Sequence, residues 1–107
     1  MRRWTLTDRY GNVIYFTEER WLHILESRTW LEPFFDLFLE TIRRGRRHQD
    51  PLIPNSYHYY CKFDELLPEN THIIVVVIFK RQLNETGDYV SNNFVVTGWA
   101  NYLWSGD

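Results

Sequence analysis

The sequence has little of what secreted, membrane or disulfide-rich proteins contain. Its only cysteine is Cys61, which excludes an internal disulfide and fits a reducing compartment. The N-terminus has basic residues but no apolar signal-peptide core, and no run approaches the roughly eighteen apolar residues of a membrane helix. The 107 residues suffice for one two-layer core, so residues 1–107 are predicted to form a single cytoplasmic domain.

Familiar catalytic and cofactor motifs are also missing. The chain has no nucleophile elbow, P-loop, dinucleotide-binding fingerprint, HExxH motif or cysteine and histidine spacing for zinc. Its four histidines are spread along the sequence, and its carboxylates form no acidic pair for two metal ions. We therefore expect no metal and no cofactor, and any hydrolytic activity should be metal-independent.

Arginine supplies most of the positive charge. Ten arginines stand against two lysines, and four of these arginines lie within the segment 43–47. A planar guanidinium suits phosphate better than the point charge of lysine does. The net charge of −2 is nevertheless poor evidence for a general nucleic-acid coat. Aromatic residues make up 18% of the chain, enough to fill a core and to leave some side chains for a stacking surface.

The segment Thr71 to Arg81 organises the predicted fold. Its apolar residues from Ile73 to Phe79 are mostly β-branched and show no polar alternation, which predicts a strand buried on both faces. The apolar segments 56–63 and 89–99 should be its antiparallel neighbours, because short polar connections join them to it. Everything before Ser56 should then cover one face of the sheet.

The first half of the chain predicts a hairpin and two helices. Two short apolar runs flank the turn signal Gly11-Asn12 and predict the hairpin. Thr17 is a candidate N-cap for a helix over residues 18–27. A second helix should begin at Pro33 and continue until Gly45 stops it. The expected fold is α+β, with the N-terminal hairpin and both helices packed on one face of a curved antiparallel β-sheet.

Alternation along the two strands that flank the central one separates their faces. Cys61 shares its face with core aromatics, so we expect a small buried hydrophobe rather than a nucleophile. The opposite face of that strand is either an ordinary exposed surface or part of a site, and it carries His58, Tyr60 and Lys62. Strict alternation in the last strand places on one side Val95, Thr97 and Trp99, and on the other Phe94, Val96 and Gly98.

Histidine, arginine, tyrosine, lysine and threonine side chains together suit metal-independent RNA cleavage. This reaction needs a base for the 2′-hydroxyl, an acid for the leaving 5′-oxygen and donors for the charge that develops on the phosphate. His23 lies on the polar arc of the first helix, where it either faces solvent or lines a cleft. The run RRGRRH over 43–48 is either a solvated helix end or a phosphate contact, and the Thr97 hydroxyl bonds either the backbone or a scissile phosphate.

Three local patterns, together with the order of elements, resemble a known nuclease group. The patterns are ERWLHILE at 19–26, the strand pair YHYYCKF and IIVVVIFK, and FVVTGWANY at 94–102. They resemble the phage- and toxin-associated branch of the BECR nuclease fold, which groups barnase-, EndoU-, colicin- and RelE-like domains. The resemblance implies an RNase-type domain whose active surface lies on the sheet and its helix-facing rim. It also implies matches to the family's histidine, threonine, arginine and tyrosine positions at His23, Thr97, one of Arg43, Arg44, Arg46 or Arg47, and Tyr59 or Tyr60.

The leading hypothesis is a small toxin-like endoribonuclease that cleaves RNA through attack of the 2′-hydroxyl. A cognate inhibitor or antitoxin protein is the expected partner beside the RNA substrate. The predicted catalytic residues are His23, Arg44, Tyr60 and Thr97. The predicted substrate-binding residues are Arg43, Arg46, Arg47, His48, His58, Lys62, Lys80 and Tyr102.

A non-catalytic protein- or RNA-binding module on the same fold is the alternative hypothesis. It is motivated by the acidic net charge and by three aromatic residues near the C-terminus, Trp99, Tyr102 and Trp104. A continuous positive strip from the segment 43–47 to Lys62 and Lys80 would favour RNA binding instead. A DNA-directed nuclease is disfavoured, because no metal-binding acidic cluster is visible in the sequence.

Overall fold

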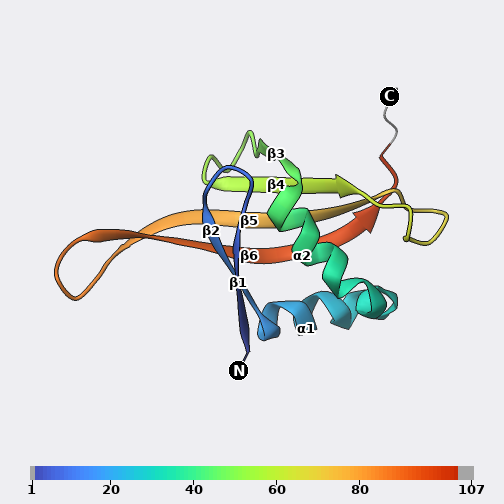
Figure 1. Ribbon diagram of the computed structural model, residues 1–107, viewed down its shortest axis with the longest axis horizontal. Coiled ribbons are helices and arrows are strands. Elements are labelled where there is room, and N and C mark those ends of the chain that lie inside the picture. The colour runs from blue at the N-terminus through green and yellow to red at the C-terminus, as the bar shows by residue number, and fades with distance from the viewer. Residues whose placement is uncertain (1, 104–107) are drawn as a thin grey trace.

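The computed structural model describes residues 2–103, and it confirms the α+β fold class (Figure 1). Six strands form one open sheet in the order β1-β2-β6-β5-β4-β3. Its elements in chain order are β1 (Arg3–Thr7), β2 (Val13–Thr17), α1 (Glu18–Ser27), the 3-10 helix η1 (Thr29–Phe34), α2 (Phe35–Arg44), β3 (Arg46–Gln49), β4 (Ser56–Lys62), β5 (His72–Leu83) and β6 (Tyr89–Asn101).

Strand β5 lies between β4 and β6 and pairs antiparallel with both, as predicted. Its residues from Ile73 to Val77 are all buried. Alternate members of this run, beginning with Ile73, join the main core beneath the helices, whereas Ile74 and Val76 are buried on the opposite face. The hairpin of β5 and β6 extends well beyond the other strands as a two-stranded arm (Figure 1).

The N-terminal hairpin both joins the sheet at β6 and crosses its helix-side face toward β4 and β3 (Figure 1). Strand β2 pairs with β6 in parallel, with Ile14 opposite Asn93, and the Asn93 amide donates a 3.0 Å hydrogen bond to the carbonyl of Val13. Strand β3 lies at the other edge, against β4. The expectation that every residue before Ser56 covers one face is therefore wrong for β3, which forms an edge of the sheet. The turn between β1 and β2 does cover the helix-side face, because Asp8 accepts a hydrogen bond from the Tyr59 hydroxyl of β4.

Local sequence explains where the helices begin. The Thr17 hydroxyl accepts a 3.2 Å hydrogen bond from the Arg20 N–H, as expected of the N-cap of α1. The second helix differs from the prediction, because Pro33 lies inside η1 and α2 begins only at Phe35. A short 3-10 segment therefore turns the chain between the two α-helices.

The helices bury one face of the sheet through aromatic contacts. The ring centroid of Trp21 in α1 lies 4.7 Å from that of Phe35 and 5.1 Å from that of Phe38, both in α2. Phe38 also approaches the sheet at Gly98, where an added Cβ would lie 2.9 Å from its ring. Gly98 therefore faces α2. We call the opposite surface of the sheet, which α1 and α2 leave uncovered, the open face.

A β-bulge places two residues of β6 on the open face. Val76 pairs with Thr97 but the next residue, Val77, pairs with Val95, so that Val96 is an extra residue in the ladder. The predicted alternation is therefore wrong at Val95, which is buried in the core on the helix side. Thr97 and Trp99 flank Gly98, and both point to the open face.

Gly45 joins α2 to β3 where no larger residue fits. Its backbone is extended, at φ −67° and ψ 156°, so it ends the helix without the left-handed conformation usual at a glycine stop. A Cβ at this position would lie 2.3 Å from the Thr41 carbonyl oxygen and 2.8 Å from that of Tyr60.

We expect Gly45→Ala to lower the free energy of unfolding by about 1–3 kcal/mol, because backbone atoms must shift to admit the methyl group. Urea denaturation of both proteins measures the difference. Equal stabilities would show that the junction between α2 and β3 is loosely packed.

Candidate active site

The strand register assembles a polar and aromatic surface on the open face. Residues paired across neighbouring strands share a face. One row across β3, β4, β5 and β6 consists of Arg46, Tyr60, Ile74 and Trp99. The next row consists of His48, His58, Val76 and Thr97. The predicted face of β4 is thereby confirmed as uncovered by helices, and β3 adds a second histidine to it.

Several members of these rows line a hollow of about 270 Å³, which we call the aromatic hollow. Its lining includes His48, His58, Tyr60, Ile74 and Trp99. The rings of His48 and His58 are 5.2 Å apart, and the Trp99 ring stands at 87° to that of His58 with centroids 6.1 Å apart. The hollow therefore combines two imidazoles with an aromatic surface of the kind on which a nucleobase can stack.

Asp50 holds one of the two histidines. Its Oδ1 accepts hydrogen bonds from the backbone N–H groups of Leu52 and Ile53, at 2.8 and 3.1 Å. The Leu52 bond is the largest cause that lowers the pKa of Asp50, and the neighbouring His58 adds to it. Oδ2 of Asp50 lies 3.5 Å from Nε2 of His58. An ionised carboxylate is thus placed to orient the His58 ring.

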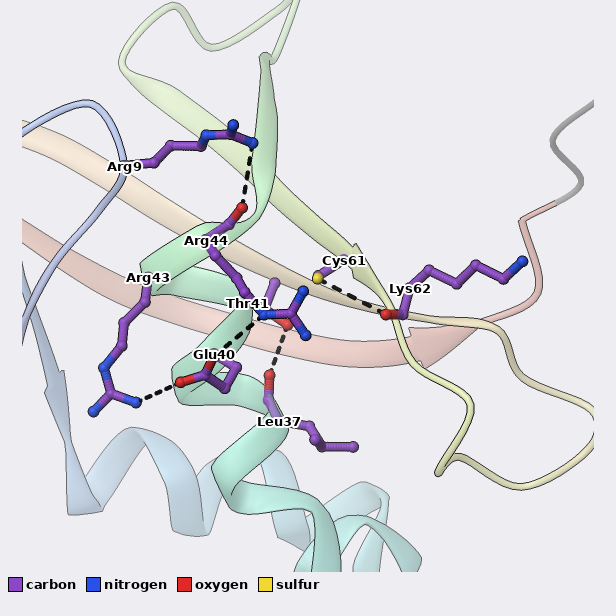
Figure 2. A network of polar contacts seen from close by, with 8 residues as sticks. All are labelled: Arg9, Leu37, Glu40, Thr41, Arg43, Arg44, Cys61 and Lys62. Atoms are coloured by element: carbon purple, nitrogen blue, oxygen red, sulfur yellow. Dashed lines mark hydrogen bonds and ion pairs between the residues drawn. The ribbon is translucent and has the colours of Figure 1, made fainter. Parts of the chain in front are cut away.

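A second hollow, of about 530 Å³, lies at the end of β4, and we call it the cationic hollow. Its cationic lining residues are Arg9, Arg44, Arg46 and Lys62. Tyr60 lines both hollows, so the two are adjacent. Figure 2 shows Arg9 reaching the backbone of Arg44, with 3.4 Å from its Nη1 to the carbonyl oxygen, and Lys62 extending past the end of β4.

Two ionisable residues in the cationic hollow are neutral near pH 7. Burial, and then the charge of Lys62, lower the pKa of His72, whose Nδ1 lies 2.6 Å from the Thr71 hydroxyl. Burial raises the pKa of the Cys61 thiol. Cys61 packs against the core from the predicted face of β4, although it is only half-buried. Its raised pKa opposes a role as nucleophile.

The arginines of the segment 43–47 do not form one phosphate-binding cluster. Arg43 and Arg44 both bind Glu40, at 2.9 and 3.2 Å (Figure 2). Arg46 points to the open face, whereas Arg47, one residue further along β3, points to the helix side. The predicted positive strip is therefore limited to Arg44, Arg46 and Lys62, which line the cationic hollow.

Arg47 belongs to a buried network. Its guanidinium lies 4.4 Å from the Tyr10 ring and 4.5 Å from the Tyr57 ring, and its Nη1 donates a 3.2 Å hydrogen bond to the Tyr59 hydroxyl. The Tyr59 hydroxyl donates to the fully buried carboxylate of Asp8. Arg47 therefore fastens the β1–β2 turn to β3 and β4 and is not placed to bind a phosphate.

Ionisation of Tyr59 should weaken the fold at high pH. Burial, and then the bond to Asp8, raise the pKa of Tyr59 above its usual 10.0. The unfolded chain then loses this proton at a lower pH than the folded chain does, so the stabilisation is complete below pH 10 and is lost as the pH rises beyond it.

We expect the free energy of unfolding to fall above pH 10 by up to about 1.4 kcal/mol per pH unit more in the wild type than in Tyr59→Phe. Urea denaturation of both proteins at intervals from pH 8 to pH 11 measures this slope. Parallel slopes would contradict the proposed proton linkage.

Other predicted residues lie elsewhere. His23 is on the exposed side of α1, with Nδ1 3.6 Å from Glu26, and α1 covers the face opposite Thr97. Lys80 is on the β5–β6 arm, where its ammonium lies 5.8 Å from the Phe94 ring. Tyr102 follows β6 and is exposed. Trp104 lies outside the described residues. The structure thus does not bring His23 and Thr97 together.

Sequence reasoning missed Asp50, Arg9 and His72. Asp50 precedes Pro51 in a turn, a place where aspartate commonly accepts hydrogen bonds from backbone N–H groups. The Asp-Pro pair is the sequence signal that could have identified Asp50. The position of Arg9 depends on the approach of the β1–β2 turn to the end of α2, which is a long-range contact. No local pattern reports such a contact.

No protein-family model matches the chain, and no curated protein or solved structure matches it significantly. The resemblance to the BECR nucleases therefore remains a prediction. Between residues 2 and 103, no helix is both long and apolar enough to cross a membrane. Over the same residues, no group of three or more histidine, cysteine or acidic side chains is arranged to hold a metal ion.

Proposed function

We propose that this protein is a metal-independent endoribonuclease whose active site is the open face of the sheet. The observation that carries the proposal is the pair of imidazoles, His48 and His58, 5.2 Å apart in the aromatic hollow with Asp50 beside His58. Two imidazoles can act as base and acid in one reaction. The cationic hollow beside them supplies positive charge for the phosphates.

In this mechanism the reacting ribose and phosphate lie in the aromatic hollow against the edges of the two histidine rings, within reach of a ring nitrogen of each. His58 takes the proton of the 2′-hydroxyl, and the Asp50 carboxylate stabilises the imidazolium that forms. The 2′-oxygen attacks the phosphorus while His48 gives a proton to the leaving 5′-oxygen. The P–O5′ bond breaks, and the products are a 2′,3′-cyclic phosphate and a free 5′-hydroxyl.

Neighbouring side chains position the RNA. A base can stack on Trp99 in the aromatic hollow, where such stacking contributes about 1–3 kcal/mol. Tyr60 lies between the two hollows and can donate a hydrogen bond to a phosphate oxygen. Thr97 lies in the same row two strands from His58, but it does not line the aromatic hollow and has no assigned role in this mechanism. His23 has no role in this mechanism, because α1 lies on the other side of the sheet.

A cognate inhibitor protein would act by covering the open face. The aromatic hollow combines apolar and aromatic side chains and includes Leu103 in its lining, and the exposed Tyr102 precedes Leu103 in the chain. Aromatic residues of this kind are enriched in protein interfaces. An inhibitor seated here would exclude RNA from both histidines.

The binding module remains the second candidate function, and the β5–β6 arm favours it. Leu83 and Tyr89 are paired at the base of its turn, and their exposed fractions are 58% and 69%. An exposed apolar pair on a projecting hairpin suits a protein contact. This function predicts partner binding by the arm without any RNA cleavage.

The test is incubation of purified protein with tRNA and messenger RNA in EDTA. We expect fragments that end in 2′,3′-cyclic phosphate, and we expect none with a His48→Ala/His58→Ala protein whose thermal unfolding shows that it is folded. Intact RNA in both reactions, with a co-purifying inhibitor excluded and ribosomes added, would contradict the nuclease proposal and favour the binding module.

A further inference from the structure

The cationic hollow gathers four permanently charged side chains outside the histidine pair. Four different elements or turns contribute to it: Arg9 from the β1–β2 turn, Arg44 from the end of α2, Arg46 from β3 and Lys62 from β4. The hollow measures about 530 Å³ and contains no carboxylate in its lining. Segments far apart in the sequence therefore contribute positively charged side chains to the same concave surface.

Most of this charge is not neutralised within the protein. Arg44 pairs with Glu40, but over residues 2–103 no carboxylate lies within ion-pair distance of Arg9, Arg46 or Lys62. Like charges held together repel one another, and an anion bound between them relieves that repulsion. Guanidinium groups also offer the paired N–H donors that phosphate oxygens accept.

The distance between the cationic hollow and the histidines determines how far apart two phosphates of one ligand must lie. His58, Tyr60 and Lys62 follow one another along the open face of β4, and alternate residues of a strand are about 7 Å apart. Lys62 is therefore displaced from His58 by about 13 Å along the strand. A phosphate at the cationic hollow is consequently not the one that reacts at the two histidines.

We propose that the cationic hollow binds a second, uncleaved phosphate of the RNA, so that the preferred substrate is an oligonucleotide with a phosphate beyond the scissile one. This inference rests on the proposed function, because the histidines define where the scissile phosphate lies. Arg46 and Lys62 are its principal ligands. Arg9 and Arg44 complete the positive surface around them.

The experiment measures binding to ligands that cannot be cleaved. The probes are 2′-deoxy dinucleotides with the internal phosphate alone, with an added 3′-terminal phosphate and with an added 5′-terminal phosphate. A terminal phosphate at one end should tighten binding to the wild type by about 10- to 100-fold, the range for hydrogen bonds to charged groups. Arg46→Gln/Lys62→Gln should lose this gain.

Arg81→Gln is the matched control, because Arg81 is exposed on the β5–β6 arm. It should keep the full gain. Equal binding of all three dinucleotides, no binding of any, or a gain that survives in Arg46→Gln/Lys62→Gln would overturn the inference. The probes lack the 2′-hydroxyl, so a phosphate-dependent gain in a protein that cuts no RNA would refute the nuclease function while leaving the phosphate site established.

Discussion

Replacing His58 by alanine should lower the rate of RNA cleavage by about 100- to 10,000-fold, the usual contribution of general acid or base catalysis. His48→Ala should cause a loss of the same order, because each imidazole moves one of the two protons. Both side chains lie on the open face and outside the main core, so both variants should fold. Initial rates on a defined RNA oligonucleotide in EDTA measure the effect.

The double variant sharpens this prediction. Residues that act as a unit in one reaction are not additive, so His48→Ala/His58→Ala should be little slower than either single variant. Arg81→Gln is the control for effects of purification and assay conditions, and it should cleave RNA at the wild-type rate. His23→Ala tests whether catalysis depends on His23 in α1 or on the pair of histidines on the open face. A large loss of activity in His23→Ala, with activity retained in His58→Ala, would show that catalysis depends on α1.

Asp8→Ala should lower the free energy of unfolding by about 3–5 kcal/mol, the cost of removing one partner from a buried ion pair. The Asp8 side chain is fully buried, and its carboxylate accepts hydrogen bonds from Tyr59, Asn12 and the Tyr10 N–H. The loss is a large share of the 5–15 kcal/mol that stabilises a typical domain. Urea denaturation at pH 7 measures it.

An exposed aspartate provides the control for Asp8→Ala. Asp64→Ala, just beyond β4, should change stability by no more than about 0.5 kcal/mol. A double-mutant cycle of Asp8→Ala with Arg47→Ala should show a coupling of about 0.5–3 kcal/mol. Additive losses would mean that the two residues act separately.

The buried network also connects stability to the site. Strand β3 has four residues and lies at the sheet edge, yet it carries both Arg46 and His48 on the open face. Arg47 between them is held by aromatic rings and by Tyr59 on the other side. The network therefore fixes the strand that presents His48 to His58.

The sequence supports the prediction of elements whose signals are local. The β-branched run from Ile73 to Phe79 predicts the central strand, and Thr17 with the acidic residues after it predicts the start of α1. Alternation correctly assigns His58, Tyr60 and Lys62 to the open face. These signals need no knowledge of distant residues.

Other features depend on contacts that a local pattern does not contain. β3 was missed because arginine, histidine and glutamine have no strong preference for strands, and its pairing with β4 and the Arg47 network stabilise it. The bulge at Val96 reverses the alternation on which the assignment of Val95 depended. The prediction assigns His23 and Thr97 to one site, but the sequence does not report which face of the sheet each residue occupies.

The most direct test of the account is a map of where RNA touches the protein. A 2′-O-methyl oligonucleotide blocks the nucleophile and can be titrated into isotope-labelled protein while NMR shifts are followed. The account predicts that the ring signals of His48 and His58 and the indole of Trp99 shift together and saturably, whereas the ring of His23 does not. Shifts confined to α1 around His23, or no shifts on the open face, would contradict it.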